Sequence, residues 1–161
     1  MTYGTIVVGT DGSVTAAKAV TEAGRLSGVH DARLIVATAY AGHHADAMSQ
    51  LAGTPAGAVS ARQAEVPADL AWTLTDRAQA EATASAGRRA AVDAGAAEVH
   101  VLSDEGSPAQ VLLEAVRLYG ADLIVVGSVG LRGARRLLGS VAEAVLHHAP
   151  CDVLVVETDA D

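Results

Sequence analysis

The chain has 161 residues, of which half are hydrophobic, and a formal net charge of −8 at pH 7. This length suits one domain over residues 1–161, while the negative charge argues against nucleic acid, which binds broad basic surfaces. The single cysteine excludes an internal disulfide, and the lack of a leader or of an apolar run of about 20 residues predicts a soluble, cytoplasmic protein without a membrane partner.

The first half of the chain alternates strand and helix patterns. The β-branched run Thr5–Gly9 predicts a buried strand, which ends in turn residues at 10–13. Ser13 is a candidate cap for the helix that follows, and Gly28 is a candidate for the C-terminal stop of this helix. Arg33–Ala39 predicts the second strand.

Residues 41–68 have no hydrophobic period and are rich in Gly, Pro, Ala and Ser. They predict a mobile loop, whose unusual length is typical of functional or disordered segments. The stretch from Asp69 to Ala94 is rich in helix formers and predicts one long helix that Gly95 ends. Glu98–Leu102 predicts the third strand.

Two helix starts stand out in the second half of the chain. Residues 107–110, Ser-Pro-Ala-Gln, combine a cap, a proline at the first helical position and a glutamine three residues after the serine. Ser140, followed by Glu143, predicts a second capping box. The fourth and fifth strands are expected at Asp122–Val126 and Asp152–Val156.

The alternation of strands with helices predicts the fold class. We expect an α/β, single-domain, Rossmann-like open parallel sheet of five strands, with helices on both faces and a frayed acidic tail at residues 157–161. Ligands of such sheets lie at the carboxyl ends of strands, where the strand order reverses. The turns at residues 10–13 and 127–130 carry suitable chemistry for such a site.

The glycine-rich turn after the fourth expected strand is the strongest functional signal. Gly127, Gly130 and Gly139 let the backbone approach an anion, and the helix that begins near Ser140 directs its N–H groups and its dipole toward negative charge. Arg132 is a candidate partner for phosphate, although loop arginines commonly form a solvated surface. The turn therefore predicts a phosphate site, and loop and cap geometry without a ligand is the alternative.

The chain resembles the universal stress protein family over nearly its whole length. Four motifs carry the resemblance: Ile6–Ser13, Val125–Gly130, Gly139–Val141 and Ala149–Val156. The resemblance implies a sheet of order 3-2-1-4-5, a homodimer, and ATP, alone or with Mg²⁺, as the bound cofactor in the branch with the glycine loop. Similarity to actinobacterial relatives implies cyclic AMP (cAMP) as the alternative ligand.

The same resemblance implies roles for individual residues. Asp11 resembles the acid beside the nucleotide, which can accept from the adenine amino group or a ribose hydroxyl or hold a metal ion; the alternative is a turn-forming aspartate. Thr38 matches the strand end whose main chain contacts adenine, and a plain strand end is the alternative. The implied nucleotide-binding residues are Thr10, Asp11, Thr38, Val126, Gly127, Gly130, Arg132, Gly139, Ser140 and Val141.

One spacing departs from the pattern of the family. The family has nine residues between the second glycine and the Gly-Ser or Gly-Thr pair, whereas eight, Leu131–Leu138, precede Gly139 here. Gly133 is permissive enough for a tighter turn to absorb the missing residue. Otherwise the helix start at Ser140 shifts relative to the phosphates.

The sequence contains no nucleophile–base pair, hydrolase elbow or P-loop that would indicate catalytic residues. The adjacent pairs His43–His44 and His147–His148 lack the spacing of a metal site on a helix face. We therefore expect a nucleotide-binding protein with a regulatory or stress-response role rather than an enzyme. A slow ATP-cleaving enzyme, a cAMP binder of the same fold and a dimeric interaction module without a ligand stay open as alternatives.

The last expected strand predicts an assembly. In the implied strand order, Asp152–Val156 lies at a sheet edge, and its apolar run lacks the Lys, Pro or bulge signals that usually blunt an edge. A two-fold partner that presents the same strand would cover this edge. We expect a homodimer through this strand, with the nucleotide sites in separate subunits.

Overall fold

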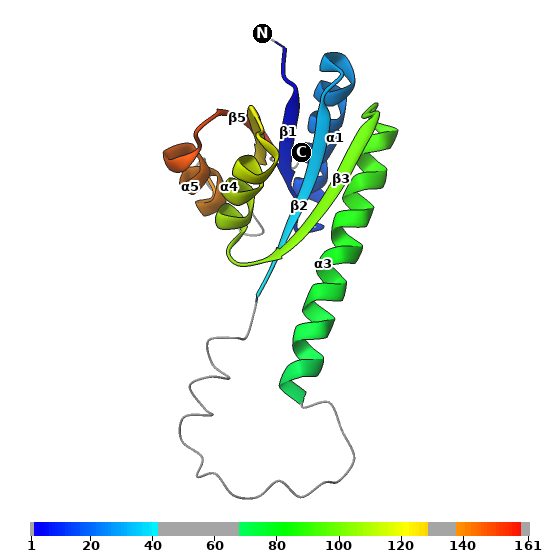
Figure 1. Cartoon of the computed structure of the whole chain (residues 1–161), viewed down its shortest axis with the longest axis vertical. Helices are drawn as coiled ribbons and strands as arrows, with labels where there is room; N and C mark the ends of the chain where they lie inside the picture. The colour runs from blue at the N-terminus through cyan, green and yellow to red at the C-terminus, as the bar shows by residue number, and fades with distance from the viewer. Residues whose placement is uncertain (1, 42–67, 129–137, 159–161) are drawn as a thin grey trace, which may run out of the picture.

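The computed structural model describes residues 2–41, 68–128 and 138–158. These residues contain a five-stranded sheet of order β3-β2-β1-β4-β5 whose neighbouring strands all run parallel, which confirms the expected α/β fold (Figure 1). The strands are β1 (Thr5–Gly9), β2 (Arg33–Tyr40), β3 (Glu98–Glu105), β4 (Leu123–Gly127) and β5 (Asp152–Val156). The helices are α1 (Val14–His30), α3 (Ala68–Asp93), α4 (Pro108–Tyr119) and α5 (Ser140–His148).

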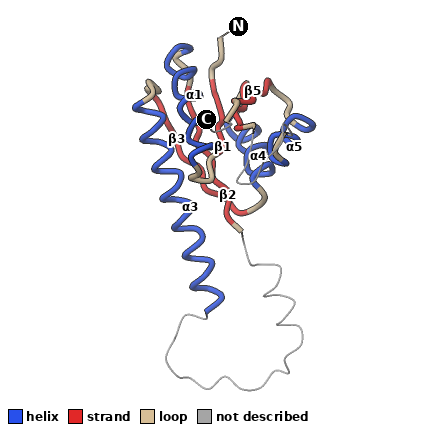
Figure 2. Tube along the Cα trace, turned by 180° about the vertical axis from the view of Figure 1, so that it is seen from behind, coloured by secondary structure: helices blue, strands red, loops and turns tan. Residues whose placement is uncertain are grey.

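Helices cover both faces of the sheet. α1 and α3 lie on one face, and α4 and α5 lie on the other (Figures 1 and 2). In β1, Ile6 and Val8 pack in the core under α1 and α3, while Val7 packs in the core under α4 and α5. A strand that is buried on both faces needs an unbroken apolar run, which is the pattern of this strand in the sequence.

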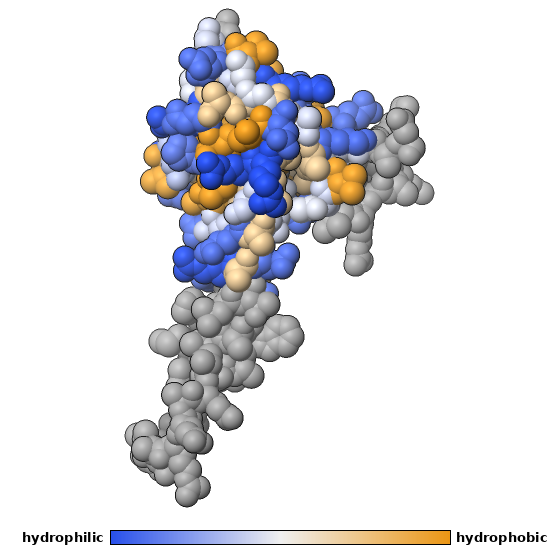
Figure 3. All heavy atoms as spheres, turned by 90° about the vertical axis from the view of Figure 1, so that its right-hand side faces the viewer, coloured by the Kyte–Doolittle hydropathy of each residue, from blue (hydrophilic) through white to orange (hydrophobic). Residues whose placement is uncertain are grey.

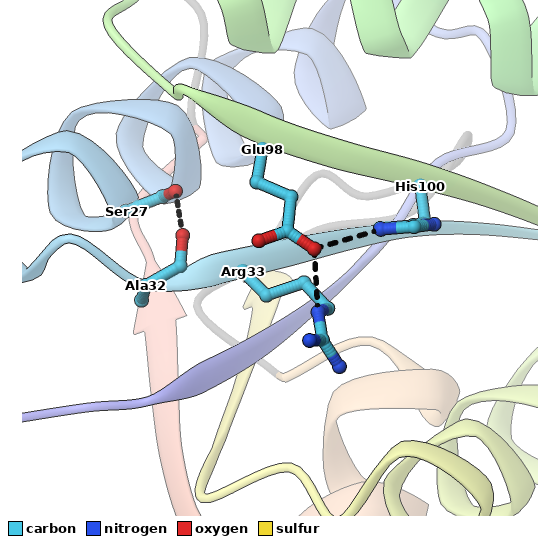
Figure 4. Close-up of polar contacts among 5 residues, drawn as sticks. All are labelled: Ser27, Ala32, Arg33, Glu98 and His100. Atoms are coloured by element: carbon cyan, nitrogen blue, oxygen red, sulfur yellow. Dashed lines mark hydrogen bonds and ion pairs between the residues drawn. The ribbon is translucent and has the colours of Figure 1, made fainter.

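The end of α1 differs from the prediction. Gly28 does not stop the helix, which continues to His30, and Asp31 takes the left-handed conformation (φ 53°) with its N–H donating to the carbonyl oxygen of Ser27. The buried Ser27 hydroxyl donates to the carbonyl oxygen of Ala32 at 2.7 Å (Figure 4). These two bonds end the helix one turn later than the glycine would.

Gly28 has a packing role instead. A Cβ atom on Gly28 would lie 2.5 Å from the carbonyl oxygen of Gly95, and one on Gly24 would lie 2.6 Å from that of Ala91. Both glycines therefore allow α1 to lie against the C-terminal end of α3. The glycine that resembles a stop signal is required by close helix packing.

The two predicted capping boxes have different outcomes. Ser107 caps α4, and its reciprocal bonds with Gln110 are both present, which confirms the first box. The second box is wrong, because Gly139 is the N-cap of α5 and Ser140 is already the first helical residue. No side chain caps α5 in the described structure, since the serine stands one position too late to do so.

The chain after β5 also differs from the expectation of a frayed tail. Glu157 is exposed, but Thr158 is completely buried and hydrogen-bonded to Ser128. Residues 159–161 lie outside the described residues, as does most of the predicted mobile loop, 42–67.

Two observations concern the surface. On the face drawn in Figure 3, hydrophobic residues occur in small groups between hydrophilic ones. Among the described residues, none of the helices has the length and apolar character that crossing a membrane requires.

Candidate functional site

A cleft opens at the carboxyl edge of the sheet, between the ends of β1 and β4. Its volume is about 810 Å³, part of which is open to solvent. The strand order reverses between these two strands, so the cleft lies where open α/β sheets bind their ligands. The first turns of α1, α4 and α5 complete its walls. We refer to it below as the switch-point cleft.

The uncapped start of α5 forms part of the cleft wall. The N–H of Gly139 donates to the carbonyl oxygen of Ser128 at 2.9 Å, and the N–H of Glu143 donates to that of Gly139 at 3.0 Å. The three residues between them, 140–142, all line the cleft, and their N–H groups have no partner among the described residues. Free N–H groups at a helix start, reinforced by the helix dipole, stabilise a bound anion.

The turn after β1 forms the neighbouring part of the cleft. Asp11 Oδ1 accepts from the N–H of Ser13 at 2.9 Å, so the turn-forming interpretation of this aspartate is confirmed for one oxygen. No partner for its Oδ2 is recorded in the described part of the chain. Thr10 Oγ1 accepts from the N–H of Gly12 at 3.2 Å, and Gly12 has a positive φ of 81°, which favours glycine. This turn is thus held by its own bonds while Asp11 retains one carboxylate oxygen for a ligand.

Another part of the cleft wall is apolar. It is built from small or branched side chains of β2, β4 and α4, namely Ala37, Ala39, Val126, Pro108, Val111 and Leu112. A wall of this kind suits a flat aromatic ring. The α4 residues were not predicted from the sequence, although the capping box at Ser107 already placed the start of this helix at the same sheet edge.

Thr38 does not line the cleft. Strand residues alternate between the two faces, and its neighbours Ala37 and Ala39 line the cleft, so the Thr38 side chain faces α1 and α3. It is 5% exposed, and its hydroxyl oxygen has no recorded hydrogen-bond partner among the described residues. The predicted main-chain contact of Thr38 with adenine stays a prediction.

The remaining predicted residues divide into two groups. Gly130, Arg132 and the shortened spacing before Gly139 fall on residues 129–137, outside the described residues. Seven predicted residues line the cleft: Thr10, Asp11, Val126, Gly127, Gly139, Ser140 and Val141. The structure therefore brings the ends of β1 and β4 and the start of α5 together around one space.

A polar cluster lies at the opposite edge of the sheet, where β2 and β3 begin (Figure 4). Glu98 Oε1 accepts from Arg33 Nε at 2.8 Å and lies 3.0 Å from His100 Nε2. These hydrogen bonds, from His100 first and then from Arg33, lower the pKa of the Glu98 carboxyl. The cluster is far from the cleft in the fold, so it is not part of the candidate site. No group of three or more potential metal-ligating side chains is found within the described residues.

Comparisons with known proteins identify relatives of the same family and fold. The model of the universal stress protein family matches residues 2–157. Universal stress protein Rv1636 of Mycobacterium tuberculosis is 38% identical over 157 residues, which cover 97% of each chain. A crystal structure of a universal stress protein in complex with cAMP is 32% identical, with a TM-score of 0.69, and the match covers 99% of this chain and 100% of that chain. The universal stress protein of Archaeoglobus fulgidus in complex with dAMP has the same fold, with a TM-score of 0.64 at 21% identity, over 98% of this chain and 100% of that chain.

Proposed function

The chain belongs to the universal stress protein family, and we propose that it binds an adenine nucleotide in the switch-point cleft. The observation that carries this proposal is that an anion-binding helix start and an apolar wall line the same cleft. The N–H groups at the start of α5 suit the phosphate, and the apolar wall of β2, β4 and α4 suits the base.

The residues divide between these two halves of the ligand. Gly127, Gly139, Ser140 and Val141 would hold the phosphate, with Gly130 and Arg132 on the connecting segment. Val126 and the main chain at Thr38 would contact the base. Thr10 and the free oxygen of Asp11 would face the ribose or a Mg²⁺ ion beside the phosphates.

ATP is the ligand that we propose first, because the glycine motif after β4 resembles that of the ATP-binding branch. Cyclic AMP is the second candidate, and a specific observation favours it: a protein 32% identical to this chain was crystallised with cAMP. The two candidates differ in the number of phosphates that the start of α5 must face.

We propose that the protein binds its nucleotide without rapid turnover and acts in regulation or in a stress response in the cytoplasm. Rapid hydrolysis needs a positioned base or a metal-activated water. Asp11 is the acid of the cleft, and one of its oxygens is already used by the turn. ATP turnover of about 1 per second, the low end of ordinary enzyme rates, would favour the enzyme alternative instead.

A homodimer through β5 is also proposed. This strand is at the edge of the sheet, and its apolar residues, Val153 to Val156, are only half-buried in the described chain. A second copy that presents the same strand would bury them.

Calorimetric titration with ATP, ADP, cAMP, adenosine and GTP tests the proposed function. We expect adenine nucleotides to bind more tightly than adenosine, because adenosine does not reach the start of α5. GTP should bind more weakly than ATP if the apolar wall selects the base. Absence of binding by every adenine compound would contradict the proposal and favour the interaction module.

A further inference from the structure

Thr158 lies two residues after the end of β5. Thr158 is completely buried, although its sequence neighbourhood is acidic and lies near the C-terminus. Its backbone N–H donates to Ser128 Oγ at 3.0 Å, and the two hydroxyl oxygens are 3.4 Å apart. The chain after β5 is therefore anchored on the residue that follows β4.

Ser128 connects this anchor to the candidate site. Its N–H donates to the carbonyl oxygen of Val156 at 2.8 Å, and its own carbonyl oxygen accepts from the N–H of Gly139 at 2.9 Å. Every polar group of Ser128 is thus engaged: one with β5, one with the residue before α5, and the hydroxyl with Thr158. A continuous series of hydrogen bonds runs from Thr158 through Ser128 to Gly139.

Neither Ser128 nor Thr158 lines the cleft. Gly127, which precedes Ser128, and Gly139, at the end of this series, both line it. Gly139 is an N-cap without a side chain, so no capping bond of its own fixes the start of α5. Among the described residues, its backbone hydrogen bond to Ser128 joins this helix start to the end of β4. The position of the free N–H groups of residues 140–142 therefore depends on the position of Ser128.

We propose that Thr158 is a positioning residue for the phosphate half of the nucleotide site, an inference that rests on the proposed function. By holding the Ser128 hydroxyl, Thr158 fixes the carbonyl group that orients Gly139 and the start of α5. Binding groups must be held to within about 0.5 Å of the productive geometry, and supporting hydrogen bonds provide this precision. The C-terminal residues thus belong to the supporting structure of the site.

A positioning role of Thr158 predicts different effects on binding of the phosphate and of the base. Most of the apolar wall comes from β2 and α4, which have no hydrogen bond to Ser128 among the described residues, and Val126 of β4 is held in the sheet by its pairing with Val155. Loss of the anchor should therefore weaken binding of the phosphate and leave binding of the base unchanged. A general loss of stability would weaken binding of both.

Three variants of the full chain test the proposal. Ser128→Ala removes the hydroxyl that accepts from Thr158 and keeps both backbone bonds of residue 128. Thr158→Pro removes the N–H donor, and Thr158→Ser is the matched control that keeps the donor and the hydroxyl. We expect Ser128→Ala and Thr158→Pro each to lower ATP affinity by about three- to tenfold, the effect of one hydrogen bond, with adenosine affinity unchanged.

The double variant and a binding-independent readout complete the test. Because both changes break the same series, Ser128→Ala with Thr158→Pro should lower ATP affinity no more than either change alone. Without any ligand, amide exchange of the Gly139 N–H should become faster in both single variants and stay at the wild-type rate in Thr158→Ser. If Thr158→Pro does not fold, Ser128→Ala carries the same comparison.

The outcomes are distinguishable. Equal losses of ATP and adenosine affinity, unchanged affinity for both, or an additive double variant would overturn the positioning role of Thr158. Wild-type protein that binds no adenine compound would instead contradict the proposed function. In that case an unchanged exchange rate at Gly139 would overturn the structural link as well.

Discussion

A Cβ atom placed on Gly9 would lie 3.2 Å from Cδ1 of Leu112, which is buried on α4. Both residues line the switch-point cleft, Gly9 as the last residue of β1 and Leu112 from α4. The separation is tight enough that any side chain at position 9 must displace the leucine. A glycine at this strand end therefore sets the width of the apolar half of the cleft.

We expect Gly9→Ala to lower adenosine affinity roughly fivefold, the equivalent of about 1 kcal/mol, because Leu112 is displaced toward the base. ATP affinity should fall by the same factor, since the phosphate half is untouched. Gly4→Ala, near the other end of the same strand, is the control, because its Cβ would meet Asp122 Oδ2 at an ordinary 3.6 Å. Calorimetric titration of both variants checks this, and equal affinity in Gly9→Ala and wild type would contradict it.

Much of the fold could be predicted from the sequence because strand burial is encoded directly in apolar runs. The run at Ile6 to Val8 indicates a strand buried on both faces, and the capping box at Ser107 sets the start of α4. These signals are local, so they do not depend on which distant segments come together.

The errors arise where a tertiary contact decides the role of a residue. Gly28 resembles a helix stop, but the carbonyl oxygen of Gly95, distant in the sequence, explains the glycine. Thr158 lies in an acidic tail, yet it is buried and hydrogen-bonded to Ser128, which is 30 residues away. The cleft residues of α4 were missed for the same reason, since they reach the site through packing rather than through a motif.

Gly28→Ala should destabilise the protein. The added Cβ would lie 2.5 Å from a backbone oxygen, so α1 and the end of α3 must move apart. Overpacking of this kind costs about 1–3 kcal/mol. Val29→Ala is the control, because Val29 lies in the same helix and is 80% exposed. Urea unfolding measures both variants, and a Gly28→Ala variant as stable as wild type would show that the two helices separate at no cost.

The cluster of Glu98, His100 and Arg33 predicts a pH dependence of stability. The folded state lowers the pKa of Glu98, so this carboxylate contributes stability above its unfolded pKa and loses that contribution as the pH falls through the folded pKa. The Glu98→Gln variant should therefore be less stable than wild type near neutral pH, and the difference should vanish in acid. Because the Glu98 side chain is exposed to solvent, salt should reduce the difference. Urea unfolding of both proteins across the acidic range checks this, and a difference that is constant with pH would contradict the assignment to Glu98.

Ser140→Asp, at the start of α5, should lower ATP affinity without lowering the stability of the free protein. A carboxylate in the first turn of a helix interacts favourably with the helix dipole, which is worth about 0.3–1 kcal/mol, so the free protein should melt at the same or a higher temperature. The same carboxylate places a negative charge beside the N–H groups of the helix start and repels phosphate, so ATP affinity should fall at least about tenfold. Leu118→Asp is the control. It adds the same charge at an exposed position near the C-terminal end of α4, whose N-terminal end lines the cleft, and it should leave ATP affinity unchanged. Retained ATP affinity in Ser140→Asp would place the phosphate elsewhere.

The backbone of β5 shows which of its groups face a second copy. Asp152 donates its N–H to the carbonyl oxygen of Asp122, and the carbonyl oxygen of Val156 accepts from Ser128, so the even-numbered residues direct their backbone groups toward β4. By the alternation of a strand, the N–H groups of Val153 and Val155 are directed to the free edge of the sheet.

Val155→Pro should therefore favour the monomer without unfolding it. Proline removes an N–H that makes no bond within the parallel sheet, and proline is tolerated on edge strands when its nitrogen faces outward. Val155→Ala is the control, because it shortens the side chain and keeps the donor. Analytical ultracentrifugation at tens of micromolar should show a dimer for wild type and Val155→Ala and a monomer for Val155→Pro, with matching circular dichroism for all three. A wild-type chain that sediments as a monomer at this concentration would refute the proposed dimer, and a dimeric Val155→Pro variant would move the interface away from the free edge of β5.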